Sequence, residues 1–139
     1  MIIRETTAQE MGDVYGKLFC DIFGFWEEHH IPDKVWLFLT DTEDDIIGFA
    51  SGFQAKSSEI FLMWGGERKQ YRGHHSKKRL REIRDYLHGK YKFIITEVEN
   101  TNLNMLRLYL SIGYIIYGIK YSTDHHTYLQ LISTKGEEQ

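Results

Sequence analysis

The sequence has few cysteines and prolines and no long apolar stretch, and each of these shortages argues against a class of protein. Its one cysteine, Cys20, can form no intrachain disulfide, which fits a reducing cytoplasm. Its one proline and its lack of repeats or low-complexity segments leave no linker that would divide it. No apolar run approaches the ~18 residues of a membrane span. Residues 1–6 also lack the basic-then-apolar pattern of a secretory signal. We therefore expect a cytoplasmic protein with no membrane partner.

The composition is that of an ordinary globular chain. Of its 139 residues, 42% are hydrophobic and 27% are charged, as in a typical soluble domain. Aromatic residues make up 14%, which argues against disorder for most of the chain. We expect one domain over residues 1–134, large enough for a core of its own, followed by a frayed tail over residues 135–139. Cys20 is expected to be a small core residue.

Hydrophobic periodicity predicts the order of the elements as β-α-α-β-β-β-α-β-α-β-β. The first helix follows a capping box formed by Thr7 and Glu10 and stops before Gly24. The other helices are expected over residues 25–30, 76–88 and 101–112. Strands are expected over residues 2–4, 35–40, 46–53, 59–67, 92–99, 114–121 and 127–133. This order predicts an α/β fold with a mixed, twisted seven-stranded sheet flanked by helices, and a parallel crossover within residues 60–99.

Basic residues are concentrated between positions 68 and 84. This segment holds eight lysines and arginines against one acid, Glu82, so its net charge is +7 in a chain of net charge −3. It includes a loop that comes before the helix expected to begin at Ser76. Free backbone N–H groups and the positive end of the helix dipole meet at such a loop, which makes it a candidate anion site. A paired Gly65-Gly66 in the preceding strand predicts a bulge or a close approach of a ligand to the backbone.

Two segments carry specific patterns. The first, Gln70-Tyr-Arg-Gly-His-His75, opens a predicted helix directly after a predicted strand, and the second runs from Asn102 through Leu108-Tyr109 to Gly113-Tyr114. Together, and in this order, they resemble the two signature segments of the GCN5-related N-acetyltransferase (GNAT) family. The resemblance spans nearly the whole chain and rests on Gln70, Arg72, Gly73 and Leu80 in the first segment and on Asn102, Leu108, Tyr109 and Gly113 in the second.

The resemblance implies the GNAT fold, with acetyl-CoA as the cofactor and acetyl transfer to a primary amine as the activity. The pantetheine of acetyl-CoA would pair with the strand before the loop, and its pyrophosphate would bind at the loop. Asn102 would also contact the cofactor. Tyr109 would act as general acid toward the departing thiolate. The implied cofactor-binding residues are Met63, Trp64, Gly65, Arg72, Gly73, His74, His75, Ser76, Lys77, Lys78, Asn102 and Tyr109.

The attacking amine must be neutral, so the reaction also needs a base. Glu97 is our candidate, and Glu59, Glu67 and Glu99 stay open as alternatives. The acceptor is expected to be a small molecule or a protein that carries a primary amine. The acceptor's identity and a homodimer are both left open by the sequence.

Two loop positions depart from the family pattern. The family has small residues where this chain has His75 and Lys77, and small residues let phosphate oxygens reach backbone N–H groups. Glu67 stands where the family usually has an aliphatic residue. One outcome is a phosphate site held by side chains. The alternative is a GNAT-fold protein without catalysis, for example one encoded by a phage, that acts through contacts with partners.

The basic run and the paired histidines allow three other interpretations. The basic run can be a solvated helix face, as charged faces usually are. Nucleic-acid binding is disfavoured because the chain is net acidic and has no nucleic-acid motif. A metal site is disfavoured because adjacent histidines, as in His29-His30 and His125-His126, do not have the spacing that lets two rings converge on one ion. We therefore expect neither a metal nor a nucleic-acid partner.

Overall fold

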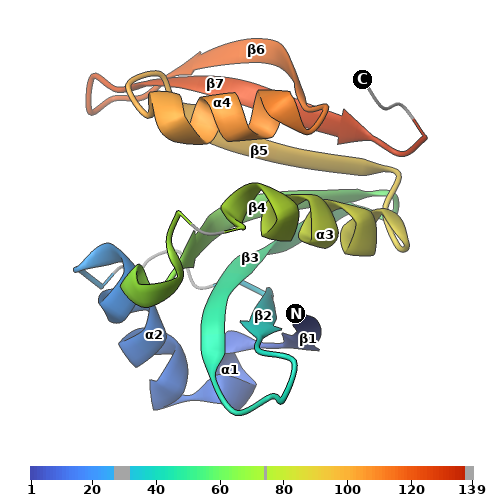
Figure 1. Cartoon of the computed structure of the whole chain (residues 1–139). Coiled ribbons are helices and arrows are strands. Elements are labelled where there is room, and N and C mark those ends of the chain that lie inside the picture. The colour runs from blue at the N-terminus through green and yellow to red at the C-terminus, as the bar shows by residue number, and fades with distance from the viewer. Residues whose placement is uncertain (27–31, 74, 137–139) are drawn as a thin grey trace. The chain divides into compact units, whose positions relative to one another are not determined.

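The computed structural model describes residues 1–26, 32–73 and 75–136. Its strands follow the predicted order, the first predicted helix is split into two, and a short 3-10 helix comes before the third α-helix (Figure 1). The elements are β1 (Ile2–Thr6), α1 (Ala8–Met11), α2 (Asp13–Phe23), β2 (Lys34–Leu39), β3 (Ile46–Lys56), β4 (Glu59–Glu67), η1 (Lys69–Tyr71), α3 (Ser76–His88), β5 (Phe93–Glu99), α4 (Leu103–Ser111), β6 (Ile115–Tyr121) and β7 (Thr127–Thr134).

The strands of the described residues form one seven-stranded sheet in the order β1-β2-β3-β4-β5-β7-β6. The pairs β1–β2, β2–β3, β5–β7 and β6–β7 are all antiparallel. The predicted fold class, a mixed seven-stranded α/β sheet flanked by helices, is therefore confirmed, and the sheet is mostly antiparallel.

The chain divides into two compact units. Unit 1 comprises Met1–Phe53 and Leu62–Ser76, and unit 2 comprises Gln54–Phe61 and Lys77–Gln139. The single domain expected over residues 1–134 stays a prediction. Of the expected tail, Lys135 and Gly136 lie in a turn, and residues 137–139 lie outside the described residues.

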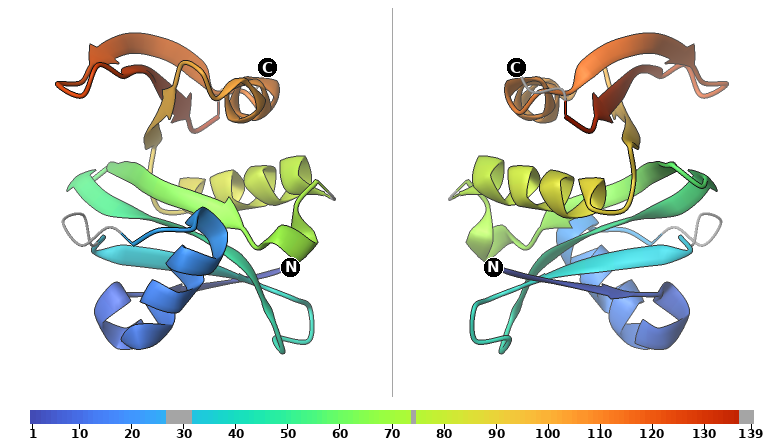
Figure 2. Two further views of the ribbon diagram at one scale, coloured as in Figure 1. Left: turned by 90° about the vertical axis from the view of Figure 1, so that its left-hand side faces the viewer. Right: turned by 90° about the vertical axis from the view of Figure 1, so that its right-hand side faces the viewer.

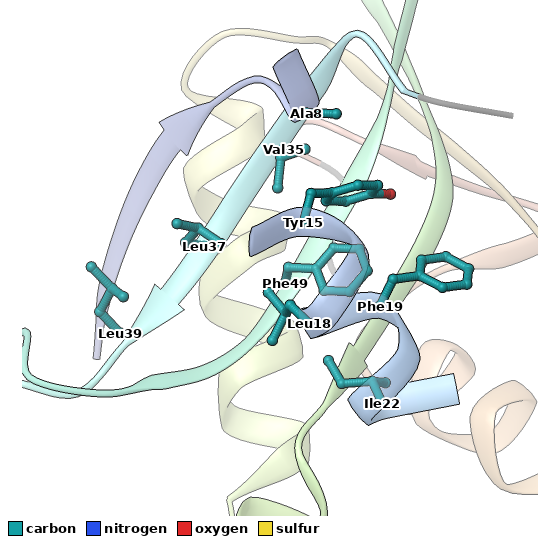
Figure 3. Close-up of a cluster of buried hydrophobic side chains, with 9 residues drawn as sticks. All are labelled: Ala8, Tyr15, Leu18, Phe19, Ile22, Val35, Leu37, Leu39 and Phe49. Carbon is teal, nitrogen blue, oxygen red and sulfur yellow. The ribbon is translucent and has the colours of Figure 1, made fainter. Parts of the chain in front are cut away.

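The core of unit 1 forms where α2 packs against β2 and β3 (Figures 2 and 3). Phe19 and Phe49 are almost fully buried there, and their ring centroids lie 6.3 Å apart. Tyr15 contacts Phe49 edge to face at 5.6 Å. Burying large aromatic side chains stabilises a fold by roughly 2–3 kcal/mol each, so this cluster anchors α2 to the sheet.

The first predicted helix is divided at Gly12 into α1 and α2. Gly12 has a φ of 58°, which a continuous right-handed helix cannot contain. Cys20 on α2 is exposed, so the core role expected for this cysteine is wrong. The short helix expected from residue 25 is not seen at Phe25 and Trp26, and its remaining residues 27–30 lie outside the described residues.

Close backbone packing explains two glycines of unit 1. A Cβ on Gly48 would lie 2.1 Å from the carbonyl oxygen of Gly66, and a Cβ on Gly66 would lie 2.7 Å from Ile22 Cγ2. Both separations are below any contact that a side chain tolerates. The close contacts at Gly66 are made by β3 and α2, and the bulge or ligand approach predicted at Gly65-Gly66 stays a prediction.

In unit 2, α4 lies alongside β5 and β7 (Figure 1). α3 buries Ile83 and Leu87 as its apolar stripe predicts, and it also buries Arg84, which is 5% exposed. The guanidinium of Arg84 donates to the carbonyl oxygen of Ile112 and pairs with Asp85. A buried charge with partners of this kind is structural, so one of the basic residues of the 68–84 run is not available to a ligand.

Candidate active site

Two residues of the loop between β4 and α3 have the left-handed backbone conformation that glycine favours. Gly73 has a φ of 85° and His75 a φ of 64°, both in the left-handed region. This region costs a residue with a side chain about 1 kcal/mol, and histidine is among the types that tolerate it best. His75 therefore keeps the conformation that glycine would adopt at this position, and its side chain is exposed.

Ser76 connects this loop to the end of β4. Its hydroxyl donates to Glu67 Oε1 at 2.5 Å and accepts a hydrogen bond from the Gly73 N–H at 3.3 Å. The chain thus places a carboxylate of its own beside an amide that is expected to meet a phosphate oxygen. A carboxylate near the first turn of a helix is stabilised by the same N–H dipoles that would hold a phosphate.

The arginines of unit 1 near this loop are engaged within the protein. Arg72 donates from Nε to the Glu67 carbonyl at 2.9 Å and from Nη2 to the Ile22 carbonyl at 2.6 Å. Arg68 pairs with Asp21 at 2.9 Å and with Asp45 at 2.8 Å. These contacts tie the end of β4 to α2 and to the β2–β3 turn, so Arg72 holds the loop in place. Its role as a phosphate ligand stays a prediction.

The lysines at the start of α3 are accessible cations. Lys77 and Lys78 are both exposed, which agrees with side chains that could reach an anion at the loop. His74, also predicted to bind the cofactor, lies outside the described residues. The predicted solvated helix face is thus partly correct: α3 exposes lysines at its start and buries Arg84.

The β4 residues predicted to bind the cofactor differ in how their side chains are used. Trp64 packs in the aromatic cluster of unit 1, with its ring 5.0 Å from Phe19 and 5.4 Å from Phe23. Met63 is half-buried and Gly65 is exposed. Pantetheine is expected to pair with the backbone of β4. The positions of these side chains therefore do not test the expected pairing.

In unit 2, Asn102 is the N-cap of α4. Its Oδ1 accepts from the Met105 N–H at 3.4 Å, the capping bond that Asn commonly forms at a helix start. Asn102 therefore has a structural role as a helix cap, and its contact with a cofactor stays a prediction.

Tyr109 on α4 is 7% exposed and packs edge to face on Tyr114, with ring centroids 4.7 Å apart. Burial raises the pKa of Tyr109 to about 12, and a hydrogen bond with Thr96 of β5 opposes the rise. The phenol is therefore neutral at any ordinary pH and keeps the proton that a hydrogen-bond donor needs.

Glu97 follows Thr96 directly, so in β5 its side chain lies on the opposite face of the sheet from the contact with Tyr109. Its carboxylate accepts from Gln130 Nε2 at 3.4 Å and lies 3.5 Å from Lys120 Nζ on β6. The sequence interpretation missed Lys120. Only the register of β6 on β7 and of β7 on β5 brings residues this far apart together.

Glu99, an alternative base, is paired with His126 through Oε1 and Nδ1 at 2.5 Å. This contact, and Asp124 beside it, raise the pKa of His126. Among residues 1–26, 32–73 and 75–136, no group of three or more His, Cys, Asp or Glu side chains is arranged to hold a metal ion. None of the described helices has both the length and the apolar character needed to cross a membrane.

No family model and no curated protein matches the sequence. Solved structures do match its fold. The chain is similar to an IAA acetyltransferase from Bacillus cereus, with a TM-score of 0.75 and 14% identity over 96% of this chain and 98% of that one. It is also similar to the ribosomal-protein-S18-alanine N-acetyltransferase from Escherichia coli, with a TM-score of 0.73 and 15% identity over 96% and 92% of the two chains.

A third similar structure is a GNAT family acetyltransferase from Elizabethkingia anophelis with acetyl-CoA bound. Its TM-score is 0.66 and its identity 12%, over 96% of this chain and 97% of that one. The fold of the chain is therefore that of the GNAT acetyltransferases, as the two sequence segments predicted. At these identities the likeness concerns the fold, and the chemistry has to be argued from the residues.

Proposed function

We propose that the protein is an N-acetyltransferase that moves an acetyl group from acetyl-CoA to a primary amine. The observation that carries this proposal is the arrangement around β5. A neutral, buried Tyr109 meets one face of the strand at Thr96, and the carboxylate of Glu97 lies on the other face. Direct attack on a thioester needs a base on the side of the amine and a donor on the side of the leaving sulfur. The fold and the loop backbone agree with acetyl-CoA as the cofactor.

Each group has a defined task in this reaction. Glu97 accepts the proton of the attacking amine, and Tyr109 donates a hydrogen bond to the sulfur as the thiolate forms. Full proton transfer from a phenol of pKa about 12 to a thiolate of pKa ~8.5 would be uphill by roughly 5 kcal/mol. Tyr109 therefore stabilises the thiolate by hydrogen bonding, and solvent protonates it afterwards.

Two parts of the binding site are assigned on the loop and the neighbouring strand. Backbone N–H groups at Gly73 and His75, with the ammonium groups of Lys77 and Lys78, would hold the pyrophosphate, because the left-handed backbone at both loop positions keeps a glycine-loop conformation. The backbone of β4 at Met63, Trp64 and Gly65 would pair with pantetheine. These residues bind the cofactor, and the groups near β5 perform the transfer.

Release of free CoA from acetyl-CoA, followed with a thiol reagent, tests the proposal. A panel of acceptors should cover polyamines, free lysine and peptides with a free N-terminus. We expect amine-dependent release with at least one acceptor, and a loss of about 100-fold in kcat for Glu97→Gln. Glu10→Gln on α1 is the matched control for a lost carboxylate and should leave the rate unchanged. Release that no amine accelerates would contradict acetyl transfer.

A non-catalytic GNAT-fold protein that acts through partner contacts is the second candidate, and one surface favours it. β6 is an edge strand, and its large side chains are 43–79% exposed. Exposed apolar edge strands tend to pair with other chains. A second copy of this chain fits the strand, because antiparallel pairing centred on Gly118 would set isoleucine opposite tyrosine, a favourable cross-strand pair. The apolar residues exposed on the strand are Ile115, Ile116, Tyr117, Ile119 and Tyr121.

Light scattering on the purified protein separates the two candidates. The second candidate predicts a dimer that Ile119→Lys dissociates, together with no binding of acetyl-CoA at millimolar concentration. A monomer that binds acetyl-CoA would contradict it. A dimer that also acetylates amines would leave acetyl transfer as the function and make β6 its dimer contact.

A further inference from the structure

Lys120 brings a primary amine to the carboxylate assigned as the base. Its Nζ lies 3.5 Å from Glu97 Oε1, close to the reach within which a carboxylate can accept a proton from an amine. The Lys120 side chain is 56% exposed and the Glu97 side chain 19%, so the lysine is free to move while the carboxylate is held. Both residues and Tyr109 belong to unit 2.

The register of the sheet explains how the side chain of Lys120 on β6 reaches across β7 to Glu97 on β5. Gly118 on β6 is opposite Gln130 on β7, and Gln130 is opposite Glu97 on β5. Lys120 is two residues beyond Gly118 and therefore lies on the same face of the sheet. Gly118 has no side chain to stand in the way, and a Cβ there would lie 2.3 Å from Gln130 Oε1. The glycine thus leaves a path over the sheet from Lys120 to Glu97.

We propose that Lys120 is a modification site, and that the protein acetylates the Nζ of its own Lys120 from acetyl-CoA. This inference rests on the proposed function, since it uses the same base and the same donor. Lys120 belongs to the acceptor class that the reaction requires, a primary amine, and the fold holds it beside the base. Holding a nucleophile next to the catalytic groups raises its effective concentration far above that of a free amine.

The step balances without any further reactant. The ammonium of Lys120, which is paired with Glu97, first loses one proton to solvent. The neutral amine then attacks the thioester carbonyl carbon, a nitrogen–carbon bond forms and the carbon–sulfur bond breaks. The amine proton passes to Glu97, and CoA leaves as a thiolate that Tyr109 stabilises and solvent protonates. The products are CoA and an uncharged acetyl-lysine. Because the acetylated side chain has no positive charge, Glu97 loses its internal cation and becomes available to an external amine.

Mass spectrometry of the full chain after incubation with acetyl-CoA tests the inference, with acetylation quantified at each lysine. We expect Lys120 to approach one acetyl group per chain at a rate at least tenfold above that of Lys56, an exposed lysine at the end of β3. Glu97→Gln should slow acetylation of Lys120 at least tenfold and leave Lys56 unchanged. Lys120→Arg keeps the positive charge but has no primary amine, so the rapid gain of one acetyl group per chain should disappear. The rate constant should not change when the protein is diluted tenfold.

The outcomes separate this inference from the proposed function. If Lys120 gains acetyl no faster than Lys56 while an added amine is acetylated, Lys120 is only a counter-ion and the inference is wrong. Equal acetylation of Lys120 in the Glu97→Gln variant would show background chemistry and would also overturn it. A rate constant that falls in proportion to dilution would show transfer between chains and would overturn the inference that each chain acetylates its own Lys120. If neither lysine nor any added amine is acetylated, the proposed function itself fails.

Discussion

The carboxylate of Glu67 is expected to weaken the binding of acetyl-CoA, and Glu67→Gln is expected to strengthen it. Ser76 Oγ lies 2.5 Å from Glu67 Oε1 and 3.3 Å from the Gly73 nitrogen, so the carboxylate is within about 6 Å of this amide. A phosphate oxygen that accepts from the Gly73 N–H would therefore meet a negative charge of the protein. Glutamine keeps the size and the acceptor oxygen of the side chain and removes that charge.

The size of the effect follows from the distance. A phosphate oxygen lies ~3 Å from the nitrogen whose N–H it accepts, so its charge would be about 6–9 Å from the carboxylate. Two unit charges at this separation repel each other by roughly 0.5–0.7 kcal/mol in bulk water and by roughly 2–3 kcal/mol at an effective dielectric constant of 20. Glu67 is half-buried and the loop is exposed, so an intermediate value of about 1–2 kcal/mol is expected. This corresponds to a Kd for acetyl-CoA about 5- to 30-fold lower in the Glu67→Gln variant.

Calorimetric titration of acetyl-CoA into the wild-type chain, Glu67→Gln and Glu59→Gln measures the effect. Glu59→Gln removes an equal charge at the other end of β4 and controls for net charge. The gain in affinity should shrink as salt is added, because salt screens charges near the surface. An unchanged Kd in Glu67→Gln, or an equal gain in Glu59→Gln, would refute the expected repulsion.

Three further predictions concern packing, catalysis and pH. Gly48→Ala should lower the free energy of unfolding by about 3 kcal/mol in urea denaturation, because the new Cβ would lie 2.1 Å from a backbone oxygen. Gly65→Ala is the control. The nearest atom to its Cβ is at 3.4 Å, so the free energy of unfolding should change by less than about 1 kcal/mol. Tyr109→Phe should leave the Kd of acetyl-CoA unchanged and lower kcat about 10- to 100-fold, because the thiolate loses its donor; an unchanged kcat would remove Tyr109 from the mechanism. The pKa of His126 is raised mainly by Glu99 and next by Asp124. The His126–Glu99 ion pair therefore stabilises the fold fully below pH ~6.5, and this stabilisation is lost as the pH rises through the raised pKa of His126. NMR titration should show that pKa falling in Glu99→Gln, and no change would contradict the assigned cause.

Elements with a strong local signal were predicted closely. The helix over 76–88 begins and ends where the structure has it, because its apolar stripe and the glycine after it are local features. The strand over 59–67 was predicted equally well. The break at Gly12 was missed because a single glycine is tolerated in many helices, and only its left-handed φ shows that this one ends α1.

The sequence marks a candidate loop, but it does not show the side-chain contacts around it. Gly73 and the dense basic charge mark the loop, yet Arg72 is held by a carbonyl of Ile22, fifty positions earlier in the chain. The sequence places Arg84 in the basic run, whereas the structure buries it, and its guanidinium donates to the carbonyl oxygen of Ile112. Lys120 reaches Glu97 through the pairing of three strands. Such partners depend on tertiary packing and register, which no local pattern of residues contains.

Binding of acetyl-CoA to the full chain, measured by titration calorimetry, tests the central claim most directly. The account predicts saturable binding of one acetyl-CoA per chain with a Kd well below a millimolar. It also predicts weaker binding after Gly73→Val, since a β-branched residue cannot easily adopt the φ of 85° that the loop requires. The absence of any binding heat at millimolar acetyl-CoA would contradict acetyl transfer, and only the GNAT fold would remain.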